Sequence, residues 1–231
     1  GDNGSHTFPS AVILRTSGHQ VVTATDAANA TITGSRSVVV GPATPANFAA
    51  TATSPSAIEL SWNPVAGASQ YEIQRRAAGG GFVALTTTGG TTFSDSPVTP
   101  GAAYVYKVRA VDAFARPSPF SAPDAATAML FTDDPVIAMT TAIKAVHITQ
   151  LRQATAAMRT TAGLSAAVFT DPELAPGSTL KAIHVQEVRT ALTEARTALG
   201  LPTLSWTDET LIPGVTAAKA AHVGELRAAA K

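Results

Sequence analysis

One ten-residue stretch returns three times in the second half of the chain, with Lys, His and Arg at fixed offsets. The copies are IKAVHITQLR at 143–152, LKAIHVQEVR at 180–189 and AKAAHVGELR at 218–227. An imidazole can ligate a metal, and zinc accepts three histidine ligands where a fold brings them together. The repeat therefore raises one hypothesis of metal chemistry, a zinc site built from His147, His184 and His222.

The cations of the same stretch raise a second hypothesis, the binding of an acidic polymer by a row of positive side chains. Its candidates are Lys144, Lys181, Lys219, Arg152, Arg189 and Arg227. The arginines are predicted to be exposed helix charges. Glu187 and Glu225 precede two of them by two positions, a spacing at which side chains on one helix do not meet.

The lysines have an alternative role that involves no ligand. Each lies near a predicted helix start, where a cation opposes the helix dipole and therefore calls for a carboxylate partner. An acidic residue recurs before every copy, at Asp133, Asp171 and Asp208. We predict a contact between each Lys and the Asp of its own unit.

The helices that must position these residues lie in a repeat of about 37 residues over 130–231. Each unit opens with an aromatic residue, Thr and Asp, and continues through a short linker into a helix. The predicted helix N-caps are Thr141, Ser178 and Thr216, because a hydroxyl can accept from unpaired backbone N–H groups. Gly163 and Gly200 are predicted to end the first two helices.

A helical wheel at about 100° per residue places the histidine on the apolar stripe. In the first copy that stripe includes Ile143, Leu151 and Met158, whereas Arg152 lies about 140° away, on the polar face. This favours a packed histidine whose ring N–H bonds a neighbouring unit's linker or its Thr-Asp turn. The units are then expected to stack as a solenoid, which would keep the three histidines apart.

Composition excludes several function classes. The 231 residues include 16 Lys+Arg and 16 Asp+Glu, so the chain has no net field to attract nucleic acid or an anionic membrane. It has no cysteine, and no apolar run or leader pattern that indicates a membrane span or a signal peptide. The low charge and the many small residues suggest an extracellular bacterial surface protein.

Residues 42–129 carry the signs of a β-sandwich. IELSW at 58–62 alternates apolar and polar residues and contains the expected core tryptophan, and YEIQR at 71–75 places Tyr71 and Ile73 inward. PGAAYVYKVRAVD at 100–112 places Tyr104 at a tyrosine corner, with further inward positions after it. The segment resembles a fibronectin type III domain, which implies a scaffold and no specific activity.

Residues 1–41 contain β-branched runs that are predicted to form strands, at Val12–Thr16, Gly18–Asp26 and Ile32–Val40, together with a motif at His6–Phe8. They resemble the C-terminal half of a bacterial immunoglobulin-like domain. About forty residues rarely form a stable sandwich alone. The half domain is therefore interpreted as a piece of a longer chain, as a sheet completed by strand addition from another chain, or as a small sheet docked on its neighbour.

The predicted fold class is multidomain. Its parts are a partial immunoglobulin-like half (1–41), a fibronectin type III domain (42–129) and an all-α domain of three repeats (130–231), which resembles bacterial C-terminal helical repeats of unknown activity. No catalytic motif or cofactor site is found, so no enzyme activity is expected. The first hypothesis is a structural or adhesive surface protein that assembles into fibres with other chains. The alternative is an ancillary tail that binds glycan or cell wall for a secreted polysaccharide-acting enzyme.

Overall fold

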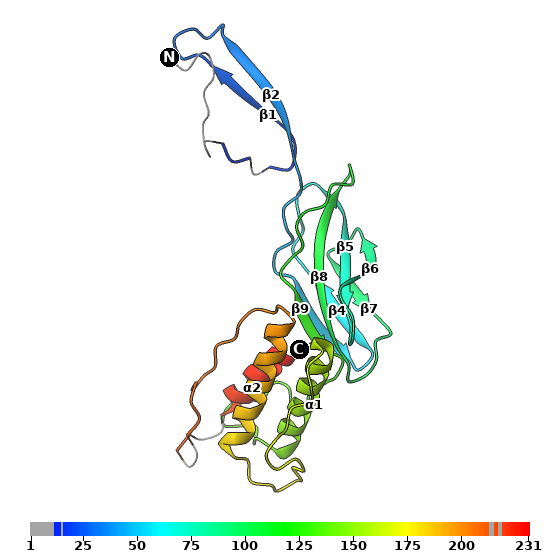
Figure 1. The fold of residues 1–231 in the computed structure, drawn as a ribbon, viewed down its shortest axis with the longest axis vertical. Helices are drawn as coiled ribbons and strands as arrows, with labels where there is room; N and C mark the ends of the chain where they lie inside the picture. Colours follow the sequence, from blue (N-terminus) through cyan, green and yellow to red (C-terminus); the bar gives the residue numbers. More distant parts are fainter. Residues whose placement is uncertain (1–11, 15, 213–214, 217–218) are drawn as a thin grey trace.

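The computed structural model describes residues 12–14, 16–212, 215–216 and 219–231, and Figure 1 shows their arrangement. A two-stranded hairpin comes first, then a sandwich of two sheets, then three helices. The predicted order of β structure followed by helices is confirmed at this level. The motif at 6–8 lies outside the described residues.

The sandwich consists of two antiparallel sheets. The first has the order β3-β4-β7 and contains β3 (Ala49–Ser54), β4 (Ala57–Ser61) and β7 (Thr92–Asp95). The second has the order β6-β5-β8-β9 and contains β5 (Ala68–Arg76), β6 (Val83–Thr88), β8 (Ala103–Asp112) and β9 (Asp124–Thr127).

The core between the sheets follows the predicted alternation. Ile58, Leu60 and Trp62 are buried, and the indole lies 5.4 Å from the Tyr71 ring between centroids. The Tyr104 hydroxyl accepts a hydrogen bond from the backbone N–H of Thr99 at 3.0 Å, which confirms the tyrosine corner.

Strand β8 is buried on its other face as well. Tyr104 and Tyr106 point into the sandwich, whereas Ala103 and Val105 belong to a second core that also contains the inward residues of the helices. The Thr161 hydroxyl donates to the Ala103 carbonyl oxygen at 2.8 Å across this contact. The sandwich and the helices therefore share a hydrophobic core.

The hairpin of β1 (Gly18–Thr25) and β2 (Thr33–Val40) extends away from the sandwich (Figure 1). Its base touches the sandwich where Ser17 Oγ donates to the Ala66 carbonyl oxygen and the His19 ring packs on Phe114. Most of its residues are exposed. The predicted strand at 12–16 is wrong, since the described residues of that run are not in a strand.

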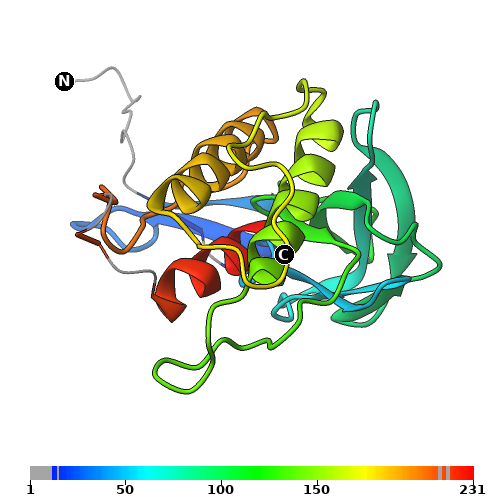
Figure 2. The ribbon, with the colours of Figure 1, turned by 90° about the horizontal axis from the view of Figure 1, so that it is seen from below.

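The three helices run in the same direction, with their C-terminal ends at the sandwich, and Figure 2 shows them from below. They are α1 (Ala145–Ala162), α2 (Ala182–Ala198) and α3 (Ala220–Ala230). Arg159 near the end of α1 reaches the Ala191 carbonyl of α2, and Arg196 near the end of α2 reaches the Ala229 carbonyl of α3. Gly163 caps α1 and Gly200 follows α2, both with left-handed backbone, as predicted.

The predicted N-caps are wrong. The N-cap residues are Lys144, Lys181 and Lys219, three positions further along the chain. The hydroxyls of Thr141, Ser178 and Thr216 instead accept from backbone N–H groups three or four residues earlier, and so close the linker turn before each helix. Local turns compete for the same Ser and Thr side chains that favour caps.

Candidate functional site

The repeated histidine closes the start of its own helix. Its Nδ1 accepts from the backbone N–H of the N-cap lysine, at 3.2 Å in His147 and His184 and 3.3 Å in His222. An accepting Nδ1 carries no proton, so the neutral ring carries its proton on Nε2. The imidazole thus does what Glu or Gln does in a capping box.

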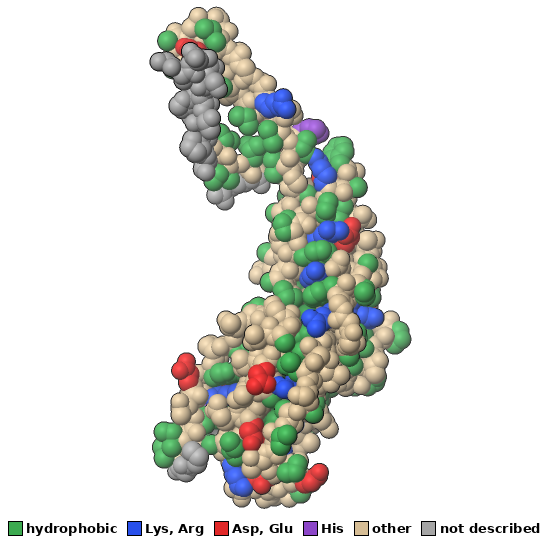
Figure 3. Space-filling view, in the orientation of Figure 1, with side chains coloured by type: hydrophobic (Ala, Val, Ile, Leu, Met, Phe, Trp, Pro, Cys, Tyr) green, Lys and Arg blue, Asp and Glu red, His purple; other side chains and the backbone are tan. Residues whose placement is uncertain are grey.

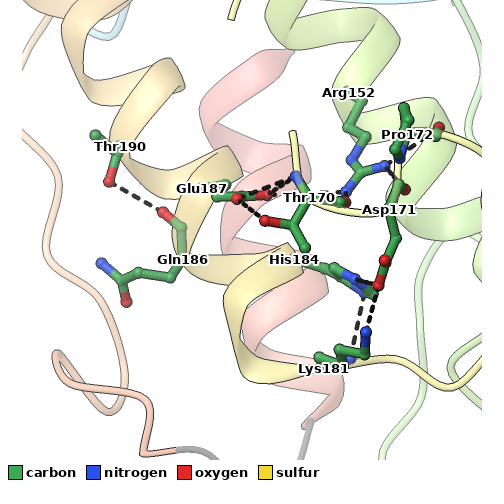
Figure 4. A network of polar contacts seen from close by, with 9 residues as sticks. All are labelled: Arg152, Thr170, Asp171, Pro172, Lys181, His184, Gln186, Glu187 and Thr190. Atoms are coloured by element: carbon green, nitrogen blue, oxygen red, sulfur yellow. Dashed lines mark hydrogen bonds and ion pairs between the residues drawn. The ribbon is translucent and has the colours of Figure 1, made fainter. Parts of the chain in front are cut away.

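The other ring nitrogen faces the carboxylate of the Thr-Asp turn. Nε2 lies 3.0–3.1 Å from Oδ2 of Asp133, Asp171 or Asp208, and the same oxygen accepts from the N-cap lysine at 2.5–2.7 Å. We call each group of Lys, His and Asp a box, and Figure 4 shows the box of the second unit. The predicted Lys–Asp contact is therefore present in all three units. The histidine does contact a Thr-Asp turn, but the predicted partner in a neighbouring unit is wrong, because the aspartate belongs to the same unit.

These contacts shift the titration of the aspartates. Hydrogen bonds from the lysine and then from the histidine hold the pKa of Asp133, Asp171 and Asp208 below the ordinary value of 3.8. A depressed folded-state pKa means that the unfolded chain takes up protons first. The three boxes therefore contribute stability that is present above pH 3.8 and is lost as the pH falls through the lower folded-state values.

We expect the melting temperature to fall as the pH is lowered from 5 to 2, and to fall less steeply in Asp171→Asn. That variant removes one of the three titrating carboxylates. The check is thermal unfolding monitored by circular dichroism at fixed ionic strength. A variant whose pH profile runs parallel to that of the parent would contradict the assignment.

A substitution at the central histidine tests the capping role. His184→Ala removes the acceptor of the Lys181 N–H and leaves a small cavity where the buried ring was, so we expect a loss of about 2–4 kcal/mol in the free energy of unfolding. His184→Gln keeps an acceptor for the N-cap N–H and should lose clearly less. Urea unfolding provides the measurement, with the exposed Thr190→Ala as control. Equal losses in the Ala and Gln variants would rule out the capping role.

The repeated arginines are not exposed helix charges, and that prediction is wrong. Arg152, Arg189 and Arg227 are 8%, 2% and 1% exposed. Each reaches into the linker of the next unit, where Arg152 donates to the Thr170 and Asp171 carbonyl oxygens at 2.7 and 2.8 Å. Burial lowers the pKa of each guanidinium group, and nearby carboxylates oppose that effect.

Each arginine also stacks on the aromatic residue that opens the next unit. The guanidinium carbon lies 4.8 Å from the Phe169 ring centroid for Arg152, and 5.2 Å from the Trp206 centroid for Arg189. The aromatic-Thr-Asp opening of each unit is therefore the place where the arginine of the preceding unit binds. It supplies a ring face and two backbone carbonyls to one cation.

The third arginine closes the chain of contacts on the first unit. Arg227 donates to the Thr132 and Asp133 carbonyl oxygens at 2.6 and 2.8 Å and lies 5.2 Å from the Phe131 ring centroid. Contacts from unit one to two, two to three and three to one form a closed ring. The solenoid expected from the sequence is wrong, because a solenoid leaves its last arginine without a next unit.

A further repeated position was missed. Gln150, Glu187 and Glu225 lie three residues after each histidine and accept from the backbone N–H of the opening threonine, at 2.9 Å in the first unit. Glu187 also accepts from the Thr170 hydroxyl at 2.6 Å (Figure 4). The sequence did contain a signal for this contact, since an acceptor side chain lies three residues after the histidine in every unit.

The predicted roles in metal and polymer binding are only partly compatible with these contacts. Among the described residues, no three His, Asp or Glu side chains gather in a way that could hold a metal ion, so the three histidines do not form a joint zinc site there. The arginines are buried and engaged with backbone carbonyls. The three lysines remain 51–55% exposed in their side chains, and polymer binding by them stays a prediction.

Acidic and basic side chains lie next to one another on the helical part of the face that Figure 3 shows. This is consistent with paired charges and with the absence of net charge in the sequence. None of the helices in the described part of the chain has the length and apolar character that crossing a membrane requires.

Three curated relatives match a part of this chain, and each is named as an enzyme. An alpha-amylase of Niallia circulans is 39% identical over 89 residues, which is 37% of this chain and 6% of the amylase. An amylopullulanase of Thermoanaerobacterium saccharolyticum is 38% identical over 86 residues, 36% of this chain and 7% of that enzyme. A poly(3-hydroxybutyrate) depolymerase of Ralstonia pickettii is 40% identical over 89 residues, 38% of this chain and 17% of that enzyme. This chain therefore spans only a small part of the length of each relative.

Solved structures with similar folds cover a comparable share of the chain. A Fn3-like protein from Clostridium thermocellum is 28% identical and covers 37% of this chain and 88% of its own, with a TM-score of 0.32. The crystal structure of FN3tt is 22% identical and covers 38% of this chain and 96% of its own, with a TM-score of 0.35. These neighbours are fibronectin type III domains. No protein-family profile matches the chain.

The two-sheet sandwich and its tyrosine corner agree with the fibronectin type III resemblance of that segment. The comparisons do not confirm the immunoglobulin-like half or a known family for the helical repeats. They also give no support to a fibre subunit, the first functional hypothesis from the sequence, and agree better with the alternative of an ancillary segment.

Proposed function

We propose that this chain is a non-catalytic accessory part of an extracellular enzyme that degrades a polymer, and that it holds the enzyme on its substrate. The observation that carries the proposal is the small share of each relative that the match covers, in three enzymes with different names. The matched part is 6%, 7% and 17% of those relatives. A segment that accompanies different enzymes and fills a minor part of each suits an accessory role.

The geometry of the repeated residues supports the same proposal. In all three units, the repeated His, Asp and Arg side chains bond other groups of the fold. A general acid or base would instead need access to a substrate atom. His147, His184 and His222 are at most 1% exposed. We therefore assign catalysis to another part of the full polypeptide.

The test is sedimentation of the purified chain with insoluble polymers: starch granules, poly(3-hydroxybutyrate) granules and bacterial cell wall. Bovine serum albumin controls for non-specific retention. Retention on at least one polymer, saturable and above the albumin level, is the expected result. If the chain stays in the supernatant with all three, the substrate-holding role is wrong.

The shared core of β8, β9 and the helices favours a second candidate, a rigid spacer between other domains. A spacer needs a fixed shape and no ligand. If no polymer retains the chain, this candidate becomes the better one. Small-angle scattering should then fit one rigid arrangement of sandwich and helices, whereas scattering from a broad ensemble of arrangements would contradict it.

A further inference from the structure

The end of the helical ring that lies away from the sandwich is hollowed. Two hollows of about 500 and 550 Å³ adjoin there, and both are lined by Ile143 and Ser178. They lie among the linkers and first helical turns, because the opposite ends of the helices pack on the sandwich. We call this surface the distal groove; its apolar lining includes Met139, Ile143, Val146, Leu174, Pro176 and Leu180.

Most polar side chains of the distal groove can donate a hydrogen bond; the exception is Thr149, whose hydroxyl donates to the Ala145 carbonyl oxygen of its own helix. The hydroxyls of Thr141 and Ser178 each accept from a backbone N–H in the described contacts, which leaves their own protons available. Lys144 and Lys219 also line the groove, and each ammonium group has three N–H donors, one of which points at an aspartate. The described lining residues include no Asp, no Glu and no aromatic ring.

Met139 is an unusual element of this surface. Its side chain is fully exposed, and its backbone φ is 61°, in the left-handed region that non-glycine residues rarely adopt. Strained backbone of this kind gathers at ligand sites, and flexible methionines are common on surfaces that bind apolar ligands. Met139 lines the same hollow as Ile143 and Leu180, and a contiguous apolar surface of this kind marks a binding site.

We propose that the distal groove binds a segment of an aliphatic polyester chain of the poly(3-hydroxyalkanoate) type. Such a chain offers ester carbonyls, which accept hydrogen bonds and donate none, on an aliphatic backbone. That pattern is complementary to donors placed around an apolar floor. A sugar polymer instead needs partners that accept from its hydroxyls, and its sugar rings stack well on aromatic side chains. The inference rests on the accessory function proposed above and names its substrate class.

The test uses the complete chain and granules of poly(3-hydroxybutyrate) in a sedimentation assay, with starch granules in parallel. Met139→Asp and Val146→Asp each place an acceptor charge in the groove. Both sites tolerate the change, since aspartate adopts positive φ more readily than methionine, and an acid in the first helical turn is favourable. Val168→Asp is the matched control, because Val168 is 92% exposed and lies outside the groove.

We expect saturable retention of the parent chain on the polyester, with an apparent Kd raised about tenfold or more in each groove variant. The control should bind like the parent. Binding that is equal in parent and groove variants would overturn the groove assignment and leave the accessory function in place. Retention on starch alone would overturn the polyester class, again without harming the accessory function. Retention on no polymer would overturn both.

Discussion

Arg227→Met is expected to lower the free energy of unfolding by about 3–5 kcal/mol, although the residue lies only four positions before Lys231, the last residue of the sequence. The substitution keeps the aliphatic part of the side chain and removes the guanidinium group. The Thr132 and Asp133 carbonyl oxygens then lose charged donors at 2.6 and 2.8 Å, and the Phe131 ring loses its cation. Hydrogen bonds to a charged donor contribute more than neutral ones, and the donor here is a guanidinium group of a residue only 1% exposed.

The same substitution distinguishes a closed ring of three units from an open stack of units. In an open stack the last arginine has no next unit, so Arg227→Met would be nearly neutral while Arg152→Met and Arg189→Met are costly. In the ring all three should be costly to a similar degree. Urea unfolding monitored at 222 nm provides the values, and Arg36→Met, on the exposed strand β2, serves as the control. A loss below about 1 kcal/mol for Arg227→Met would show that closure contributes little.

The sandwich could be predicted from the sequence because its signals are local. Alternation with a period of two places Ile58, Leu60 and Trp62 on one face, and this pattern requires no knowledge of the partner strand. The tyrosine corner likewise depends on a short range of chain, since Tyr104 bonds the backbone five residues earlier. The inner core therefore lies where the pattern places it.

The arginines could not be placed in the same way. A helical wheel describes one helix and its apolar stripe, and Arg189 lies far from that stripe. In a closed ring each helix has a neighbour on both sides, so a face at about 140° from the stripe is covered by the next unit. The repeated aromatic residue was a usable signal, because an aromatic face is a suitable partner for a buried guanidinium group.

The histidines show an intermediate case. Their position on the apolar stripe correctly indicated burial, and the recurring Asp indicated a polar partner. Two backbone facts could not be seen in the sequence. The helix begins one turn later than the hydroxyl pattern suggests, and Asp171 has a positive φ of 49° that places its carboxylate beside both Lys181 and His184. The local linker turn and the Lys–His–Asp contacts within the unit set the helix start.

The shared core leads to the second large effect, which we expect at Val105. In an isolated sandwich this outward side chain of β8 would face water, and an acid there would cost little. Here it is 0% exposed and belongs to the core that includes α1. Val105→Asp buries a carboxylate without a partner, so we expect a loss of at least about 4 kcal/mol or separation of the helices from the sandwich.

Hydrogen exchange distinguishes these outcomes because it reports each element separately. Separation should leave the amides of β5 protected, since the inner core is untouched, while the amides of α1 exchange faster by orders of magnitude. Thr87→Asp is the matched control, because Thr87 is an exposed residue on the same outer sheet face, on β6. If Val105→Asp matches this control in both stability and exchange, the helices do not depend on the sandwich face that they cover, and the two parts fold as independent units.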